Sequence, residues 1–171
     1  MARPRTKRFD PYAILAALEQ ERAIYILIGA FARVIEGSDE TTLGLDLTPS
    51  MRPENLGRLE LALASINARR ADGSAPELET TDFEREPVIE LTTDHGQVKV
   101  VPLPEGTRGY EDLRRAAIRE PIGRGLRPSV ASMGDLARML GALGREEDIP
   151  KLLMMRRLIE LDRSRGLSIE R

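Results

Sequence analysis

Apolar and polar residues follow two different periods along the chain, which predicts a mixture of helices and short strands. Apolar residues at helical spacing predict a helix from Pro11 to about Glu21. Asp10 can accept hydrogen bonds from the first free backbone N–H groups, and proline is tolerated at the first helical position. The uninterrupted apolar run 24–28 instead predicts a buried strand.

The same two patterns continue to the end of the chain and predict an α/β (α+β) fold. The further elements expected, in chain order, are a short helix (30–36), a strand (43–47), a helix (54–69), two strands (88–92 and 98–101) around the turn His95-Gly96, a helix (110–117), an edge hairpin (121–130) and two helices (133–143 and 147–163). This order favours a short mixed β-sheet flanked by helices, with a helical C-terminal element.

The length favours one folded unit. We expect a basic flexible tail over residues 1–8 and a single domain over 9–165. Within the domain, the sheet core should occupy about 22–130 and the C-terminal helices about 132–165.

Composition excludes several classes of site. With no cysteine, the chain has no disulfide framework, no thiolate zinc site and no cysteine nucleophile. No apolar run approaches the roughly 18 residues of a membrane span, and no apolar core follows the basic start as it would in a secretory signal. We therefore expect a cytoplasmic protein without membrane contact.

The charged residues give only a weak indication of whether the chain binds nucleic acid. The formal net charge is −2, so no global field attracts nucleic acid. Only three of the 26 basic residues are lysines, and arginine forks match phosphate oxygens well. Nucleic acid could be contacted by the basic tail, or the tail could simply be solvated; its basic residues are Arg3, Arg5, Lys7 and Arg8.

Three short motifs occur in a fixed order around the first two predicted strands. They are Gly29-Ala30, the stretch Thr42–Asp46 and Pro53-Glu54-Asn55. Together with the hairpin 91–102 they resemble the minimal nucleotidyltransferases of the DNA polymerase beta superfamily, in particular the abortive-infection-type toxin branch of bacterial toxin–antitoxin systems. The resemblance covers most of residues 10–160 and implies a nucleotidyltransferase-like fold.

The resemblance also implies a chemistry. Such enzymes move a nucleoside monophosphate from a triphosphate to a hydroxyl, using two magnesium ions held by carboxylates. Two aspartates at i and i+2 on a strand share one face, so both can reach the metals. By this resemblance Gly29, Ala30 and Thr42 would contact the nucleotide and Asp46 would be a catalytic and metal-binding carboxylate.

The sequence departs from the family pattern at two of the expected carboxylates. Gly44 occupies the first aspartate position and Lys99 the third, which leaves Asp46. We hypothesise that the Lys99 ammonium forms a salt bridge with Asp46 and so replaces the metal.

These departures leave three hypotheses about function. The first is a catalytically degenerate pseudoenzyme that binds a nucleotide, a nucleic acid, a protein partner or a second copy, without a cofactor. The second is an active nucleotidyltransferase that uses magnesium and a nucleoside triphosphate. The third is a structural subunit of a larger complex.

Overall fold

The structure is a computed structural model that describes residues 8–169. It contains one mixed sheet of six strands in the order β3-β4-β2-β1-β6-β5. β1 is antiparallel to β2 and parallel to β6, and β2 is parallel to β4. The strands are β1 (Tyr25–Ile28), β2 (Gly44–Pro49), β3 (Ile89–Thr93), β4 (Gly96–Val100), β5 (Ile118–Arg119) and β6 (Ser129–Val130). The predicted mixed α/β fold is confirmed.

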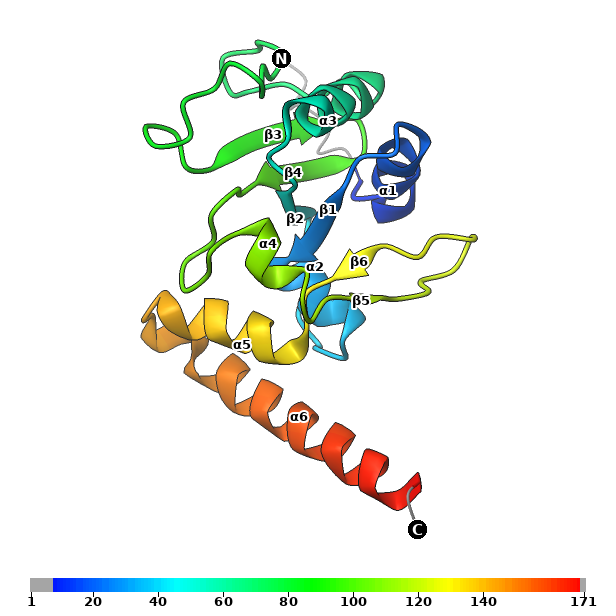
Figure 1. The fold of residues 1–171 in the computed structure, drawn as a ribbon, viewed down its shortest axis with the longest axis vertical. Coiled ribbons are helices and arrows are strands. Elements are labelled where there is room, and N and C mark those ends of the chain that lie inside the picture. The colour runs from blue at the N-terminus through cyan, green and yellow to red at the C-terminus, as the bar shows by residue number, and fades with distance from the viewer. Residues whose placement is uncertain (1–7, 170–171) are drawn as a thin grey trace, which may run out of the picture.

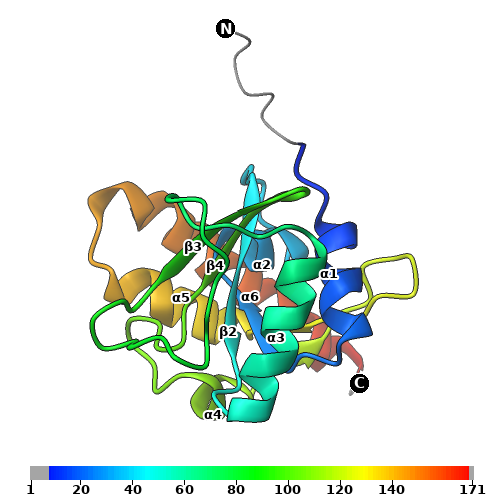
Figure 2. The same cartoon turned by 90° about the horizontal axis from the view of Figure 1, so that it is seen from above.

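Helices cover both sides of the sheet. Figure 1 shows α1 and α3 on one side and α2, α5 and α6 on the other, with α6 extending away from the body of the molecule. Figure 2 shows the strands β2, β3 and β4 beside α3. The helices are α1 (Pro11–Gln20), α2 (Gly29–Ile35), α3 (Pro53–Ser65), α4 (Tyr110–Leu113), α5 (Met133–Ala142) and α6 (Ile149–Ile169).

The alternation of side chains in β2 and β4 separates the core from the candidate site. Leu45 and Leu47 pair in register with Val98 and Val100, and all are buried toward α1 and α3. The intervening residues point to the opposite side, which we call the α2 face. This face carries Gly44, Asp46, Gln97, Lys99 and Glu90.

The start of α3 is fixed to the sheet by one buried side chain. Asn55 is 1% exposed, its Oδ1 accepts from Ile24 N at 2.7 Å, and its Nδ2 donates to the carbonyls of Ile24 and Ser50 at 2.8 Å. Asn55 therefore joins the start of β1 to the end of β2. The asparagine of the Pro53-Glu54-Asn55 motif has this structural function here.

Three helix boundaries differ from the prediction. α3 ends at Ser65 rather than near residue 69, because Asn67 adopts a left-handed backbone with φ of 54°. α4 ends at Leu113 rather than 117, shortly before β5 begins. α6 follows a 3-10 turn at Glu146–Asp148 and continues past residue 163. The predicted N-cap is confirmed, since Asp10 Oδ1 accepts from Ala13 N at 3.2 Å.

The structure bears differently on the predicted basic tail and on the expected lack of a membrane span. Three basic residues of the tail, Arg3, Arg5 and Lys7, lie outside the described residues. Within the described part of the chain, we find no helix with the length and apolar character needed to cross a membrane.

Candidate functional site

Gly29 and Asp46 lie in direct contact where β1 passes into α2. Gly29 has φ of +73°, a conformation that side chains disfavour, and it begins α2 immediately after the last residue of β1. A Cβ atom at this position would lie 2.5 Å from Asp46 Oδ2. Glycine is therefore required for the carboxylate of Asp46 to pack against the backbone at this turn.

Asp46 is partly buried, and burial is the main reason that its pKa is raised. The positive charges of Lys99 and Arg33 act in the opposite direction, while Glu90 raises the pKa further. Among the hydrogen bonds and ion pairs of residues 8–169, none reaches the Asp46 carboxylate. Asp46 thus offers an unpaired carboxylate on the α2 face.

The hypothesised salt bridge between Lys99 and Asp46 is not formed. The two residues are neighbours in the parallel pairing of β2 and β4. However, Lys99 Nζ lies 3.7 Å from Glu90 Oε1 on the other adjacent strand, and no contact within 4.0 Å joins it to Asp46 in the part of the chain that the structure describes. Both partners are exposed, by 43% for Lys99 and 73% for Glu90, so this pair contributes little to stability.

Gly44 lies where strand pairing leaves no space for a side chain. A Cβ atom at Gly44 would lie 2.4 Å from the carbonyl oxygen of Gln97 and 2.7 Å from Gln97 Cβ. An aspartate at this position would require β2 and β4 to move apart. The position at which the resemblance implied a first carboxylate is therefore one where the two strands approach closely.

The other two residues predicted to contact a nucleotide differ in their surroundings. The Thr42 hydroxyl donates to the Gly44 carbonyl at 2.8 Å and accepts from Gly44 N at 3.3 Å. It is thus occupied by the turn that leads into β2. Ala30 lies in the first turn of α2, beside Gly29, and is partly buried.

A buried ion pair beside Asp46 was not predicted from the sequence. Arg33, on α2, is 8% exposed and donates through Nε and Nη2 to the two carboxylate oxygens of Glu40, each at 2.8 Å. Ser38 Oγ donates to the same carboxylate at 2.7 Å. The Arg33 hydrogen bonds are the main cause that lowers the pKa of Glu40 to about 2. A bidentate pair across a loop of this kind has no local sequence signal.

This ion pair continues into the C-terminal helices. Lys151 Nζ lies 3.4 Å from Glu40 Oε1 and 3.7 Å from Asp148 Oδ1. Asp148 is 1% exposed and accepts from Arg145 Nε at 2.6 Å. We call these five residues, Arg33, Glu40, Asp148, Lys151 and Arg145, the charged cluster. It connects α2 to the start of α6.

The residues on the α2 face do not fit a site for two magnesium ions. Such a site needs several carboxylates that converge, because magnesium prefers hard oxygen ligands in octahedral geometry. The described residues contain no group of three histidine, cysteine, aspartate or glutamate side chains placed to hold a metal ion. Asp46 is the one carboxylate on β2, and its register partner on β4 is the cationic residue Lys99.

Comparison with known proteins adds little to this geometry. No protein-family model matches the sequence, and no curated protein matches it. Among solved structures, the chain is similar to a crystal structure described as that of a candidate nucleotidyltransferase from Thermotoga maritima. The TM-score is 0.44 and the identity 16%, over 92% of this chain and 89% of that chain. A likeness of this size carries no argument about activity, substrate or site residues.

Proposed function

We propose that this chain is a nucleotidyltransferase-like protein that no longer transfers nucleotides and acts by binding. One observation carries the proposal: the Gly44 backbone is packed against the Gln97 carbonyl, so the position of the first expected carboxylate is closed. Two further observations agree with it. Lys99 places a positive charge beside the site and pairs with Glu90. The Glu40 carboxylate is already bound by Arg33, so it is not available to a metal. The lack, among residues 8–169, of three histidine, cysteine, aspartate or glutamate side chains placed to hold a metal ion also supports the proposal.

The test is a transfer assay with the full chain. Purified protein is incubated with labelled ATP, GTP, CTP or UTP, magnesium and candidate acceptors, beside the variant Asp46→Asn. The proposal predicts no transfer in either sample. Transfer that the wild type performs and Asp46→Asn does not would overturn it and support the active enzyme.

The active enzyme remains the second candidate because the Asp46 carboxylate has no partner among residues 8–169 and lies against the glycine turn. Nucleotide binding without transfer is an intermediate case. Calorimetry with each triphosphate, with and without magnesium, separates these cases. Binding that is independent of magnesium and unaffected by Asp46→Asn would favour the degenerate protein.

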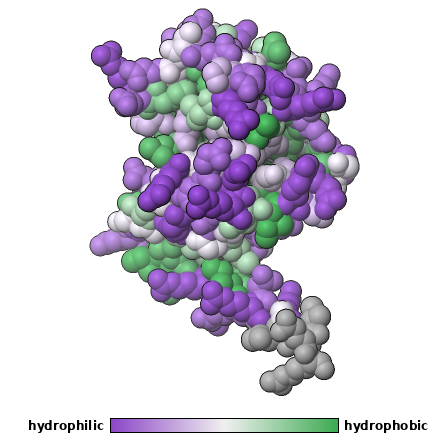
Figure 3. Space-filling view, in the orientation of Figure 1, coloured by the Kyte–Doolittle hydropathy of each residue, from purple (hydrophilic) through white to green (hydrophobic). Residues whose placement is uncertain are grey.

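A protein partner or a second copy is supported by the surface of α6. Figure 3 shows apolar surface near the corner between α5 and α6. Leu143, Ile149 and Leu153 are 45%, 52% and 59% exposed there. Light scattering of wild type and Leu153→Glu tests self-association: a mass above one chain that Leu153→Glu reduces would support the second copy.

A further inference from the structure

A cavity of about 350 Å³ lies away from Asp46, at the opposite end of β1. Its walls come from the end of α1, the start of β1, Tyr110 on α4 and the β5–β6 hairpin. The volume falls at the lower end of the roughly 300–1,000 Å³ of small-molecule sites. A small ligand could therefore enter it, whereas folded macromolecules could not.

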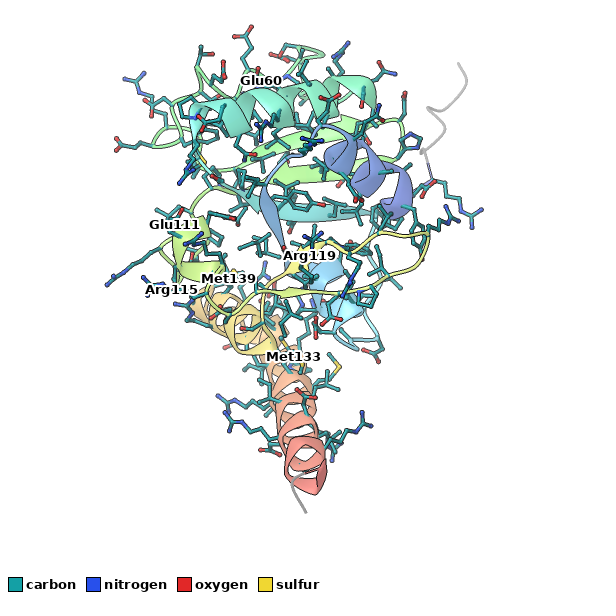
Figure 4. The ribbon with its side chains drawn as sticks, turned by 45° about the vertical axis from the view of Figure 1, so that its right-hand side comes forward. Glu60, Glu111, Arg115, Arg119, Met133 and Met139 are labelled. Carbon is teal, nitrogen blue, oxygen red and sulfur yellow. The ribbon has the colours of Figure 1, made fainter. Side chains whose placement is uncertain are left out.

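The cavity is strongly basic. Arg22, Arg119 and Arg127 line it, and Glu19 is the one acidic residue among its lining residues. The three arginines form no ion pair with another described residue; Arg119 Nε donates instead to the Arg127 carbonyl at 3.1 Å. Arg119 lies on the short β5 strand at the sheet edge (Figure 4). In a chain whose net charge is −2, this is a local surplus of two positive charges.

Arg22 enters the cavity from the end of α1. It has φ of 55° immediately after that helix, where Ala23 N bonds to the Leu18 carbonyl at 3.0 Å. Glycine is the usual residue at such a left-handed helix end, because it avoids the steric cost of a Cβ atom. Arg22 can therefore be replaced by glycine without a backbone penalty, which makes it a suitable position for a test.

The remaining wall suits a flat apolar ring. Leu15, Ile24, Leu126 and Pro128 supply apolar surface. Tyr25 lines the cavity together with Glu19 and Arg119, and its hydroxyl has no hydrogen bond to another described residue. Burial is the main cause that raises its pKa, so it stays a neutral hydroxyl that can donate to an anion.

We propose that this cavity binds a phosphate monoester carried on a flat ring of nucleoside size. Guanidinium groups match phosphate oxygens in bidentate geometry, and three of them without carboxylate partners suit a dianion. The ring would lie against the apolar wall and the tyrosines. This site is separate from Asp46, so it does not depend on the proposed function.

Calorimetric titration of the full chain with AMP tests the proposal, with adenosine and inorganic phosphate as partial ligands. AMP should bind with one-to-one stoichiometry and at least tenfold more tightly than either. Binding of AMP that is undetectable at millimolar concentration, or no tighter than that of adenosine, would overturn the proposal. Tighter binding of a 5′-phosphorylated oligoadenylate than of AMP would overturn the assignment to a small molecule.

Two variants at left-handed positions separate ligand contact from structure. Arg22→Gly removes a lining guanidinium and the backbone strain together, so we expect an unchanged or raised Tm and at least tenfold weaker AMP binding. Arg124→Gly is the matched control, since Arg124 also has φ of 55° but lies over Tyr12 outside the cavity. Arg124→Gly and Asp46→Asn should both bind AMP with the affinity of the wild type. Equal losses in Arg22→Gly and Arg124→Gly would reveal a general charge effect and contradict the proposal.

Discussion

At the residue scale, the two glycines around Asp46 have different functions. Gly29 allows a left-handed turn and makes room for the Asp46 carboxylate. Gly44 has an ordinary extended conformation in β2. Glycine is required there because the Gln97 backbone occupies the space that any side chain would need. The chemistry available on the α2 face is therefore limited by backbone packing as well as by the residues present.

The requirement at Gly44 can be measured by adding a single methyl group. Gly44→Ala should lower the free energy of unfolding by about 1–3 kcal/mol, the usual cost of overpacking. Gly134→Ala is the control, because its Cβ would meet only Ser132 Oγ at 3.9 Å within helix α5. Alanine there should be neutral or stabilising by up to about 1 kcal/mol. Urea denaturation measures both, and equal stability of Gly44→Ala and wild type would contradict the close strand approach.

Asp46 should reduce stability at neutral pH. Its pKa is raised in the folded protein. Between the ordinary pKa of 3.8 and this raised pKa, the native state therefore retains a proton that the unfolded chain has released. Stability that this group provides at low pH is lost as the pH rises above the ordinary value of 3.8 and through the raised folded value. Asp46→Asn removes this dependence, so its Tm should exceed that of the wild type at pH 7 and approach it near pH 3. A lower Tm of Asp46→Asn at pH 7 would show that the ionised carboxylate has a stabilising partner.

At the element scale, the sheet depends on polar side chains at the strand ends. The apolar run of β1 and the alternation in β2, β3 and β4 predicted these strands because each has at least one buried side. The start of β1 and the end of β2 are fixed instead by the hydrogen bonds of Asn55. These interactions join residues that are distant in sequence, and a periodic pattern contains no information on them.

Asn55 offers a direct test of this dependence. Asn55→Leu keeps the approximate volume but leaves the Ile24 N–H and the Ser50 carbonyl without their partner, whereas the Ile24 carbonyl still accepts from Ser50 N. We expect a loss of about 3 kcal/mol in unfolding free energy, since buried backbone groups without hydrogen bonds cost about 1–3 kcal/mol each. Arg58→Gln, on the exposed side of α3, is the control and should change stability by less than about 0.5 kcal/mol. A loss below 1 kcal/mol in Asn55→Leu would mean that water or a shift of α3 replaces the bonds.

The candidate site was predicted in part. The resemblance implied that Lys99 lies near Asp46 and that a glycine turn follows β1, and the structure places both beside Asp46. The prediction that Lys99 pairs with Asp46 was wrong. The flexible ammonium group reaches the exposed Glu90 without leaving water, whereas Asp46 is partly buried. The pair Arg33–Glu40 could not be predicted, since it depends on the path of the loop between α2 and β2.

At the scale of the whole molecule, the charged cluster holds the start of α6 against the sheet domain. α6 otherwise extends from the body, and its residues Leu153 and Leu161 are more than half exposed. Among the described side chains of α6, Met155 is the one large apolar residue that is fully buried, with 2% exposed. The position of this helix should therefore depend on ionic contacts, and so on pH.

Glu40→Gln tests this dependence. The pKa of Glu40 is about 2 in the folded protein against 4.5 ordinarily, so its stabilisation is complete above pH 4.5 and is lost as the pH falls toward 2. The variant should be less stable at pH 7 by about 3 kcal/mol and equal to the wild type near pH 2. Hydrogen exchange should accelerate first in α6. Glu105→Gln, an exposed residue without an ion pair among residues 8–169, is the control, and equal exchange of α6 in both variants would contradict the role of the cluster.

The close contact between Gly44 and Gln97 also has an evolutionary consequence. If the chain descends from an active nucleotidyltransferase, as the proposed function implies, the neighbouring strand now occupies the space that an aspartate at position 44 would need. A substitution at Gly44 alone would then cause a folding defect before it supplied any metal ligand, and Lys99 would still oppose a cation. Under that proposal both strands would have to change together, so single substitutions would not restore transfer.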